Sequence, residues 1–191
     1  MTPRERVGTA LRFGAPDRLP RNDSFWQQTL RRWQAEGLPA DADPATYFEF
    51  DIRMTFLDPS PRFPMVVRER GDGMITYEDR YGYTIRKEDG GESTLDFLAH
   101  RTRDRATWEQ EIKPRLVLDP EGEARLDTSS YFGHFAPYPT WAEAAEKHRE
   151  LYATNGYVLC MMYGPWEAAW RHRGMEPLLM DLLLDPEWVE D

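Results

Sequence analysis

An apolar run near the C-terminal end of the chain reads Tyr157-Val158-Leu159-Cys160-Met161-Met162-Tyr163. Apolar and polar residues do not alternate in it, which is typical of a strand buried on both faces, as in a parallel sheet. The next residues are Gly164-Pro165-Trp166-Glu167, in which Pro suits a first helical position and Glu suits the positive end of a helix. A strand, a tight turn and a helix in this order form one unit of an α/β fold. Binding sites of such folds lie in the loop after the strand, so Gly164 and Trp166 are candidate binding residues.

The segments after this unit are predicted to be helical. One helix spans Met175 to Leu184, and Asp185-Pro186-Glu187 caps and opens another. The chain stops at Asp191, just inside that last helix. We therefore expect the chain to be a fragment of a longer domain.

Composition limits the class of protein. The chain has 191 residues, a net charge of −10 and 40% hydrophobic residues, which is enough for one ordinary core. The acidic balance argues against nucleic acid or an anionic membrane as a partner, since either needs a basic patch. The single cysteine excludes an intrachain disulfide and any multi-cysteine metal site. With no apolar leader at Met1 to Arg6 and no run long enough to span a membrane, we expect a cytoplasmic protein.

Three segments separated by helical patterns are predicted to be parallel neighbours in one sheet: Asn22 to Trp26, Ile52 to Leu57 and Val158 to Tyr163. Short strands joined by tight turns predict an antiparallel meander from Met65 to Arg86. Helices are expected from the capping box at Thr2 to about Phe13, from Gln27 to Glu36, from Asp43-Pro44 to Phe48, from Asp104 to about Leu116, and from Thr140 to about Ala153.

The order and spacing of several motifs resemble the N-terminal part of the uroporphyrinogen decarboxylase superfamily, which also contains corrinoid-linked methyltransferases. The motifs are Thr2-Pro3-Arg4-Glu5-Arg6-Val7, Pro16-Asp17-Arg18-Leu19-Pro20, Phe50-Asp51-Ile52, Thr107-Trp108-Glu109, Lys113-Pro114-Arg115-Leu116, Gly164-Pro165-Trp166-Glu167, Gly174-Met175-Glu176 and Asp185-Pro186-Glu187. The resemblance implies a (β/α)₈ TIM barrel, a fold of about 250 residues. Residues 1–191 would form the N-terminal half of this single domain, with the antiparallel meander inserted in it.

The resemblance also implies a catalytic residue. In the decarboxylases an aspartate at the end of an early strand engages the pyrrole N–H groups and supports protonation of the ring as carbon dioxide leaves. Asp58, at the end of Phe56-Leu57-Asp58, stands where that motif would place it. An ionised carboxylate there would stabilise cationic character on a pyrrole. The alternative is that Asp58 only caps the turn at Pro59, as other aspartates before prolines do in this chain.

Four other residues are candidates for substrate contact in addition to Gly164. Trp26 and Trp166 each follow a predicted strand and would line an aromatic cleft for a flat ring, although such residues are more often part of a core. Arg21 and Asp23 share the end of the first predicted strand and are expected to be polar groups at the rim of the cleft.

The sequence departs from both branches of the superfamily. The arginine-rich motif that holds carboxylates in the decarboxylases is absent, and Arg31 and Arg32 lie on a predicted helix instead. The methyltransferases bind zinc through a His-x-Cys pair and a distant Cys, and no His-x-Cys occurs here. Cys160 is predicted to be a small core residue. Of the histidines, His134 and His148 are expected in surface positions, and His172 is expected to complement a helix C-terminus.

Three functions remain open. The first is a uroporphyrinogen decarboxylase-like enzyme domain acting on a tetrapyrrole or corrinoid-linked small molecule by decarboxylation or methyl transfer. The second is a zinc-dependent methylcobamide:thiol methyltransferase, with zinc and a corrinoid as cofactors bound by residues outside this chain. The third is a non-catalytic half-barrel that pairs with another chain. Because a barrel site needs loops from several strands, residues 1–191 alone are expected to be inactive and to self-associate.

Overall fold

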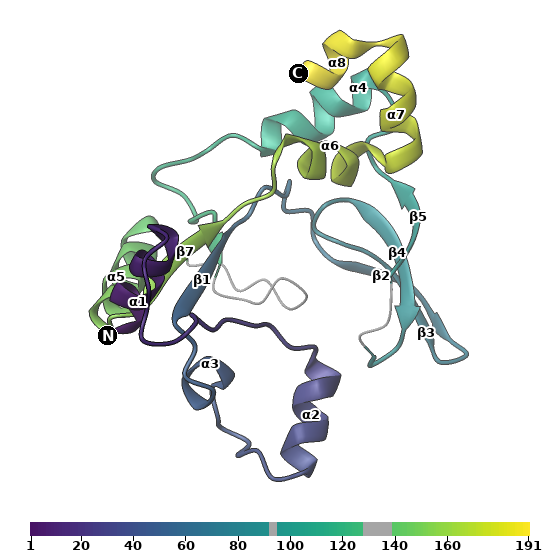
Figure 1. Cartoon of the computed structure of the whole chain (residues 1–191). Helices are drawn as coiled ribbons and strands as arrows, with labels where there is room; N and C mark the ends of the chain where they lie inside the picture. The colour runs from purple at the N-terminus through teal and green to yellow at the C-terminus, as the bar shows by residue number, and fades with distance from the viewer. Residues whose placement is uncertain (92–94, 128–138) are drawn as a thin grey trace. The chain divides into compact units, whose positions relative to one another are not determined.

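The computed structural model describes residues 1–91, 95–127 and 139–191. It shows a mixed α/β chain with one parallel strand pair and one larger antiparallel sheet (Figure 1). The chain divides into two compact units. The first unit comprises Met1–Asp58 and Asp119–Met162, and the second comprises Pro59–Leu118 and Tyr163–Asp191. The assignment of residues 1–191 to one barrel domain stays a prediction.

The first unit is built on a three-stranded sheet in the order β6-β1-β7. Strand β1 (Ile52–Leu57) runs parallel to β7 (Tyr157–Met161), with Ile52 opposite Tyr157 and Phe56 opposite Met161. The predicted parallel pairing of these two segments is therefore confirmed. Strand β6 (Leu126–Asp127) is antiparallel to the end of β1. The strands that the structure describes do not close into a barrel.

Two predictions about this sheet are wrong. Residues 22–26 form no strand: the Arg21 carbonyl accepts from the Asp51 N–H just before β1, and the chain then continues to helix α2 (Gln27–Ala35). Strand β7 is not buried on both faces, since Leu159 and Cys160 are exposed. In the described part of the chain β7 is an edge strand with β1 as its one neighbour, which explains the exposure.

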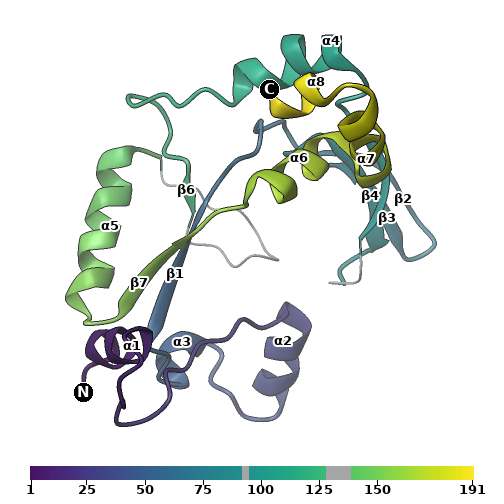
Figure 2. The same ribbon diagram turned by 45° about the horizontal axis from the view of Figure 1, so that its top comes forward.

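Four helices accompany this sheet: α1 (Pro3–Leu11), α2 (Gln27–Ala35), α3 (Pro44–Tyr47) and α5 (Trp141–Ala153). The capping box at Thr2 is confirmed, because the Thr2 hydroxyl accepts from the Glu5 N–H and the Glu5 carboxylate accepts from the Thr2 N–H. Figure 2 shows α5 along the sheet. There the ring of His148 contacts the hydroxyl of Thr55 on β1 at 3.2 Å, so His148 packs against the sheet.

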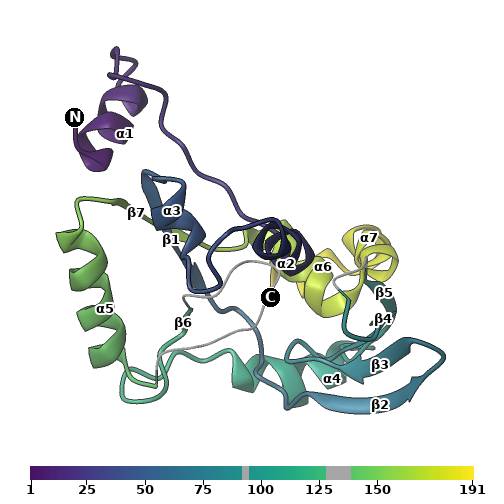
Figure 3. The ribbon, with the colours of Figure 1, turned by 90° about the horizontal axis from the view of Figure 1, so that it is seen from below.

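The second unit contains a four-stranded antiparallel sheet in the order β2-β3-β4-β5. Its strands are β2 (Val66–Gly71), β3 (Met74–Glu78), β4 (Tyr83–Glu88) and β5 (Asp96–His100). The predicted meander is confirmed, and β2 and β3 form the hairpin seen in Figure 3. Strand β5 was missed, because Leu95 to His100 carries no clear alternation of apolar and polar residues.

The helix predicted from Asp104 to Leu116 is broken into three short segments. They are α4 (Arg105–Thr107), a π-helical turn (Trp108–Ile112) and a 3₁₀ turn (Lys113–Arg115). Pro114 has no N–H to donate, and its ring collides with the carbonyl four residues earlier, so a regular α-helix cannot continue through it. The segment nevertheless buries Ile112 completely.

Three more helices end the chain: α6 (Pro165–Arg173), α7 (Met175–Leu184) and α8 (Pro186–Glu190). The core of the second unit contains Tyr81, Tyr83 and Ile85, with Tyr77 and Tyr163 packed against them. Among the described helices, none combines the length and the apolar character needed to cross a membrane.

Candidate functional site

Asp58 is buried at the C-terminal end of β1, with 1% of its surface exposed. Its N–H donates to the carbonyl of Arg125 at 2.9 Å, and the Arg125 guanidinium donates back to the carbonyl of Asp58 at 3.3 Å. The antiparallel pairing of Leu57 with Leu126 brings these two residues together. The backbone of Asp58 is thus held firmly at the end of a strand that has a parallel neighbour, where α/β folds place functional groups.

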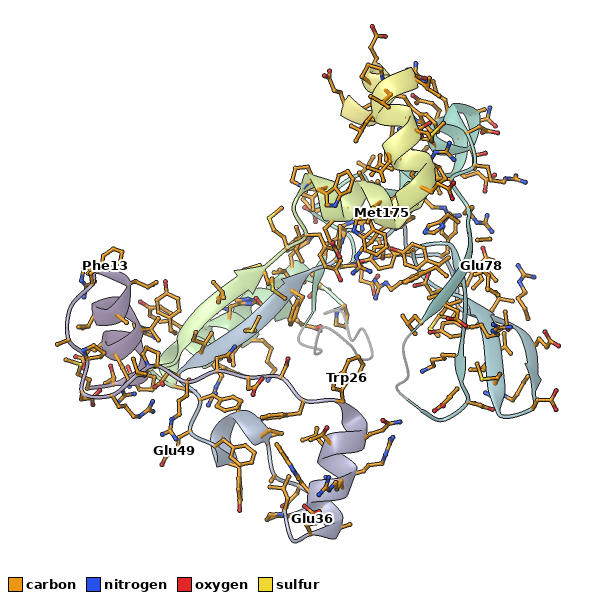
Figure 4. All side chains as sticks on the ribbon, turned by 45° about the vertical axis from the view of Figure 1, so that its right-hand side comes forward. Phe13, Trp26, Glu36, Glu49, Glu78 and Met175 are labelled. Carbon is orange, nitrogen blue, oxygen red and sulfur yellow. The ribbon has the colours of Figure 1, made fainter. Side chains whose placement is uncertain are left out.

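Arg21 and Asp23 lie together on the wall of a pocket of about 410 Å³ in the first unit. The Arg21 guanidinium pairs with the Glu49 carboxylate at 3.1 Å, and Glu49 also lines the pocket. Figure 4 shows Glu49 after α3 and Trp26 where the chain enters α2. Asp23 and Arg21 were predicted as rim groups of a cleft, and the structure brings both to this pocket.

The other walls of this pocket are aromatic. They are formed by Phe25, Trp33, Tyr47, Phe48 and Phe50. The Phe25 and Trp33 rings meet edge to face with centroids 4.8 Å apart, and the Trp33 and Phe48 rings do so at 5.5 Å. Sequence reasoning missed these residues, although their density between positions 25 and 50 was a visible signal.

A buried carboxylate, Asp51, ties the N-terminal segments to the start of β1. It accepts hydrogen bonds from the guanidinium groups of Arg6 and Arg18 and, at 2.7 Å, from the N–H of Arg21. Arg6 also donates to Asp17 at 2.6 Å. These residues carry three of the motifs behind the family resemblance, so in this structure those motifs have a structural role.

The pKa values within this cluster follow from its hydrogen bonds. Burial works to raise the pKa of Asp51, but the bonds from Arg18, the Arg21 N–H and Arg6 outweigh burial and leave that pKa below its ordinary value. The bond from Arg6 lowers the pKa of the Asp17 carboxyl, and the same bond raises the pKa of Arg6. Asp51, Asp17 and Arg6 are therefore ionised at neutral pH.

The remaining predicted contact residues are exposed. Trp26 is 43% exposed and Trp166 is 45% exposed, so neither is a core residue. Trp26 is not among the residues that line the pocket. Gly164 is the N-cap of α6, and a Cβ built on it would meet no atom within 4 Å. Gly164 and Trp166 belong to the second unit, whereas Asp58, Arg21, Asp23 and Trp26 belong to the first.

A cluster of aromatic and histidine rings in the second unit was not predicted. The Tyr81 and Tyr83 rings stack with centroids 5.2 Å apart, His100 meets Tyr83 at 5.2 Å, and His172 lies 5.9 Å from Trp108. His172 lies in the last turn of α6, at the helix C-terminus where it was predicted, and it is buried there. Burial lowers the pKa of His172 to about 4, although a hydrogen bond to the Pro59 backbone acts in the opposite direction.

The described residues do not fit a zinc site. Within residues 1–91, 95–127 and 139–191, no three His, Cys, Asp or Glu side chains gather closely enough to hold a metal ion. Cys160 is exposed on β7, so its prediction as a core residue is wrong. His134 lies outside the described residues.

Comparison of the chain with protein-family models, with curated proteins and with solved structures gives no significant match. Function is therefore inferred from the chain's own residues and their geometry.

Proposed function

We propose that this chain is an enzyme domain of the uroporphyrinogen decarboxylase type that acts on a tetrapyrrole or corrinoid-linked substrate by decarboxylation or methyl transfer. The observation that supports this most is the buried carboxyl-bearing residue Asp58 at the C-terminal end of a strand with a parallel neighbour. In this proposal β1 and β7 are adjacent strands of a (β/α)₈ barrel, and Asp58 faces the substrate at the end of the barrel that carries active sites.

The proposed role of Asp58 is electrostatic. A carboxylate in a site sheltered from water stabilises positive charge that develops on a pyrrole far better than solvent does. Arg21, Asp23 and Trp26, which belong to the same unit as Asp58, are the proposed substrate contacts, and the roles of Gly164 and Trp166 stay predictions from the sequence. The single cysteine supports a reducing compartment, so we place this activity in the cytoplasm.

The two branches of the superfamily would differ in cofactor. The methyltransferase branch would use zinc to activate a thiol and a corrinoid to carry the methyl group. Because the described residues do not fit zinc, no step proposed for this chain passes through a metal. The residues of the chain itself are assigned only to substrate binding and to charge stabilisation.

The experiment that tests this function compares the variants Asp58→Asn and Asp43→Asn in the full-length natural protein. Asp43 is another aspartate before a proline, and its carboxylate caps α3 by accepting from the Thr46 N–H at 2.9 Å. The assays measure carbon dioxide release from uroporphyrinogen and methyl transfer from methylcobalamin to a thiol. We expect Asp58→Asn to lower turnover about 100-fold with a small change in melting temperature. Asp43→Asn keeps an oxygen that can cap α3 and should leave turnover unchanged.

Two results would reject this function. Wild-type turnover in Asp58→Asn, with a reduced melting temperature, would make Asp58 a structural cap of the turn at Pro59. Absence of both activities, together with no binding of either substrate by the wild-type protein, would remove the enzyme proposal itself.

A second candidate function is a non-catalytic half-barrel that pairs with another chain. The observation that favours it is the apolar surface of α7, where Leu183 is 83% exposed and Leu184 is 74% exposed. Exposed apolar clusters of this kind often mark protein contacts. This function requires an oligomer in light scattering and no turnover of either substrate.

A further inference from the structure

The proposed function uses Arg21 and Asp23 at the pocket of the first unit, but it leaves the aromatic walls of this pocket unused. Its size, about 410 Å³, is within the range of pockets that take small organic molecules. Ring faces carry negative electrostatic potential, so several rings around one space attract a cation with little cost of desolvation. Trp33, which provides the strongest such face, contacts both Phe25 and Phe48 in the wall.

The charges on the wall of the pocket sum to one negative charge. Arg21 and Glu49 neutralise each other through their ion pair at 3.1 Å. Asp23 accepts a hydrogen bond from the Ser24 N–H at 2.8 Å, and no ion pair joins it to a cation within the described residues. The carboxylate of Asp23 is therefore available as the counter-charge of a ligand.

The backbone at Glu49 shapes this wall. Glu49 has a left-handed conformation with φ of 53°, which is uncommon for a residue other than glycine. Its N–H donates to the Thr46 carbonyl at 3.1 Å, and the Phe50 N–H donates to the Ala45 carbonyl at 2.8 Å. This Schellman arrangement ends α3 and places Phe48, Glu49 and Phe50 in succession on the pocket wall.

From these contacts we infer that the pocket binds a small organic cation, a methylated ammonium group held by the aromatic rings with Asp23 as its counter-ion. The ring faces attract the diffuse charge of the methylated nitrogen, and the carboxylate fixes the side from which it enters. The charge of Arg21, which also lines the pocket, is neutralised by its pairing with Glu49. This inference goes beyond the proposed enzyme function and does not depend on it.

The test is calorimetric titration of the full chain with choline and with 3,3-dimethylbutan-1-ol, its uncharged carbon isostere. Choline is expected to bind at least about tenfold more tightly, because the two molecules differ mainly in charge and the rings favour the cation. Equal affinity for both molecules would show a merely hydrophobic pocket and would overturn the inference. The inference would also be overturned if choline showed no saturable binding at concentrations up to about 50 mM, because a dissociation constant above that value is too weak for a specific site.

Variants locate the site. Asp23→Asn and Trp33→Leu should each weaken choline binding about fivefold or more, since each removes one attractive contact. Asp41→Asn is the matched control: it removes the same charge from an exposed loop residue outside the pocket wall and should leave binding unchanged. Trp33→Phe keeps a ring and shows whether any loss in Trp33→Leu reflects unfolding. Equal losses in Asp23→Asn and Asp41→Asn would reject Asp23 as counter-ion.

The result is separable from the test of the enzyme function. A protein that binds choline at this pocket but shows neither decarboxylation nor methyl transfer keeps the cation site and loses the proposed reaction. A protein with turnover that depends on Asp58 but without choline binding keeps the reaction and loses the cation site.

Discussion

At the scale of single residues, buried charges and rings decide which parts of the chain are structural. Asp51 is fully buried and accepts from Arg6, Arg18 and the Arg21 N–H. When one member of a buried ion pair is removed, its partner stays buried without a counter-charge. The loss of stability is then larger than the stability that the pair itself contributes. Motif residues near the N-terminus are therefore explained by folding alone, and the functional proposal depends on Asp58 instead.

We predict that Asp51→Asn lowers the free energy of unfolding by about 3–5 kcal/mol, because it leaves Arg18 without a carboxylate partner and Arg6 with Asp17 alone. Urea unfolding at pH 7 measures this. The control Asp41→Asn removes an exposed carboxylate and should change stability by less than about 0.5 kcal/mol. Equal small effects of both substitutions would show that the cluster around Asp51 does not hold the N-terminal segments.

The pH dependence of stability should report on His172. Burial lowers its pKa in the folded protein to about 4, whereas in the unfolded chain it is near the ordinary value of 6.5. Between these two values the unfolded state binds more protons, so stability falls as the pH drops from 6.5 to 4. Through this group the free energy of unfolding falls by about 3 kcal/mol between pH 6.5 and pH 4.

The variant His172→Phe keeps a ring among Tyr81, Trp108 and their neighbours but cannot take up a proton. Its free energy of unfolding, relative to wild type, should rise by up to about 3 kcal/mol between pH 7 and pH 4. Urea unfolding at several pH values measures the difference. Asp79, whose pKa is raised to about 6 by burial, acts in the opposite direction but is common to both proteins. Parallel pH profiles of variant and wild type would contradict a neutral buried His172.

At the scale of elements, the corner between α6 and α7 depends on a glycine. Gly174 has φ of 94°, and a Cβ built on it would lie 3.1 Å from Nδ1 of His100. Both the backbone conformation and the close approach to His100 on β5 therefore disfavour a larger residue. This corner fixes where α7 begins, so the position of the helix is set by a contact with a strand far away in sequence.

We predict that Gly174→Ala lowers the free energy of unfolding by at least about 2 kcal/mol, through backbone strain and the contact with His100 together. Gly73→Ala is the control, because Gly73 also has a positive φ, 73°, but a Cβ there meets nothing within 4 Å. Gly73→Ala should lower the free energy of unfolding by only about 1 kcal/mol, because it introduces backbone strain without a close contact. Chemical denaturation of both variants checks this, and equal costs would mean that β5 does not constrain the corner.

At the scale of the whole molecule, apolar surface on α7 competes with the strong net negative charge of the chain. Helix α7 exposes five apolar side chains: Leu179, Met180, Leu182, Leu183 and Leu184. The net charge of −10 makes copies of the chain repel one another. Salt screens this repulsion and leaves the apolar attraction. Association is therefore expected to strengthen as ionic strength rises.

The prediction is that the protein associates with itself in light scattering, more strongly in about 0.5 M salt than in about 0.05 M salt. The double variant Leu183→Glu, Leu184→Glu should reduce the mean mass toward that of a monomer. Leu118→Glu changes an exposed leucine outside α7 and is the control that should leave the mass unchanged. A monodisperse monomer at both salt concentrations would rule out a contact through α7.

The sequence by itself determined the features that depend on neighbouring residues. Spacing and turn chemistry within a few residues account for four features. These are the capping box at Thr2, the helices at Gln27 and Trp141, the hairpin of β2 and β3, and the helix start at Pro165. The parallel pairing of β1 with β7 was also predicted, because helical segments separate the two apolar runs. Candidate residues Arg21 and Asp23 were found, but not the rings beside them.

Only the tertiary structure decided which of these elements are covered and which side chains meet. Contacts between residues far apart in the chain decide several features: the exposure of β7, the absence of a strand at residues 22–26, the ion cluster around Asp51 and the burial of His172. The periodicity of a segment shows which face is apolar, but not whether another segment covers that face. A residue's burial, and with it its charge state and availability to a ligand, is therefore a property of the folded chain.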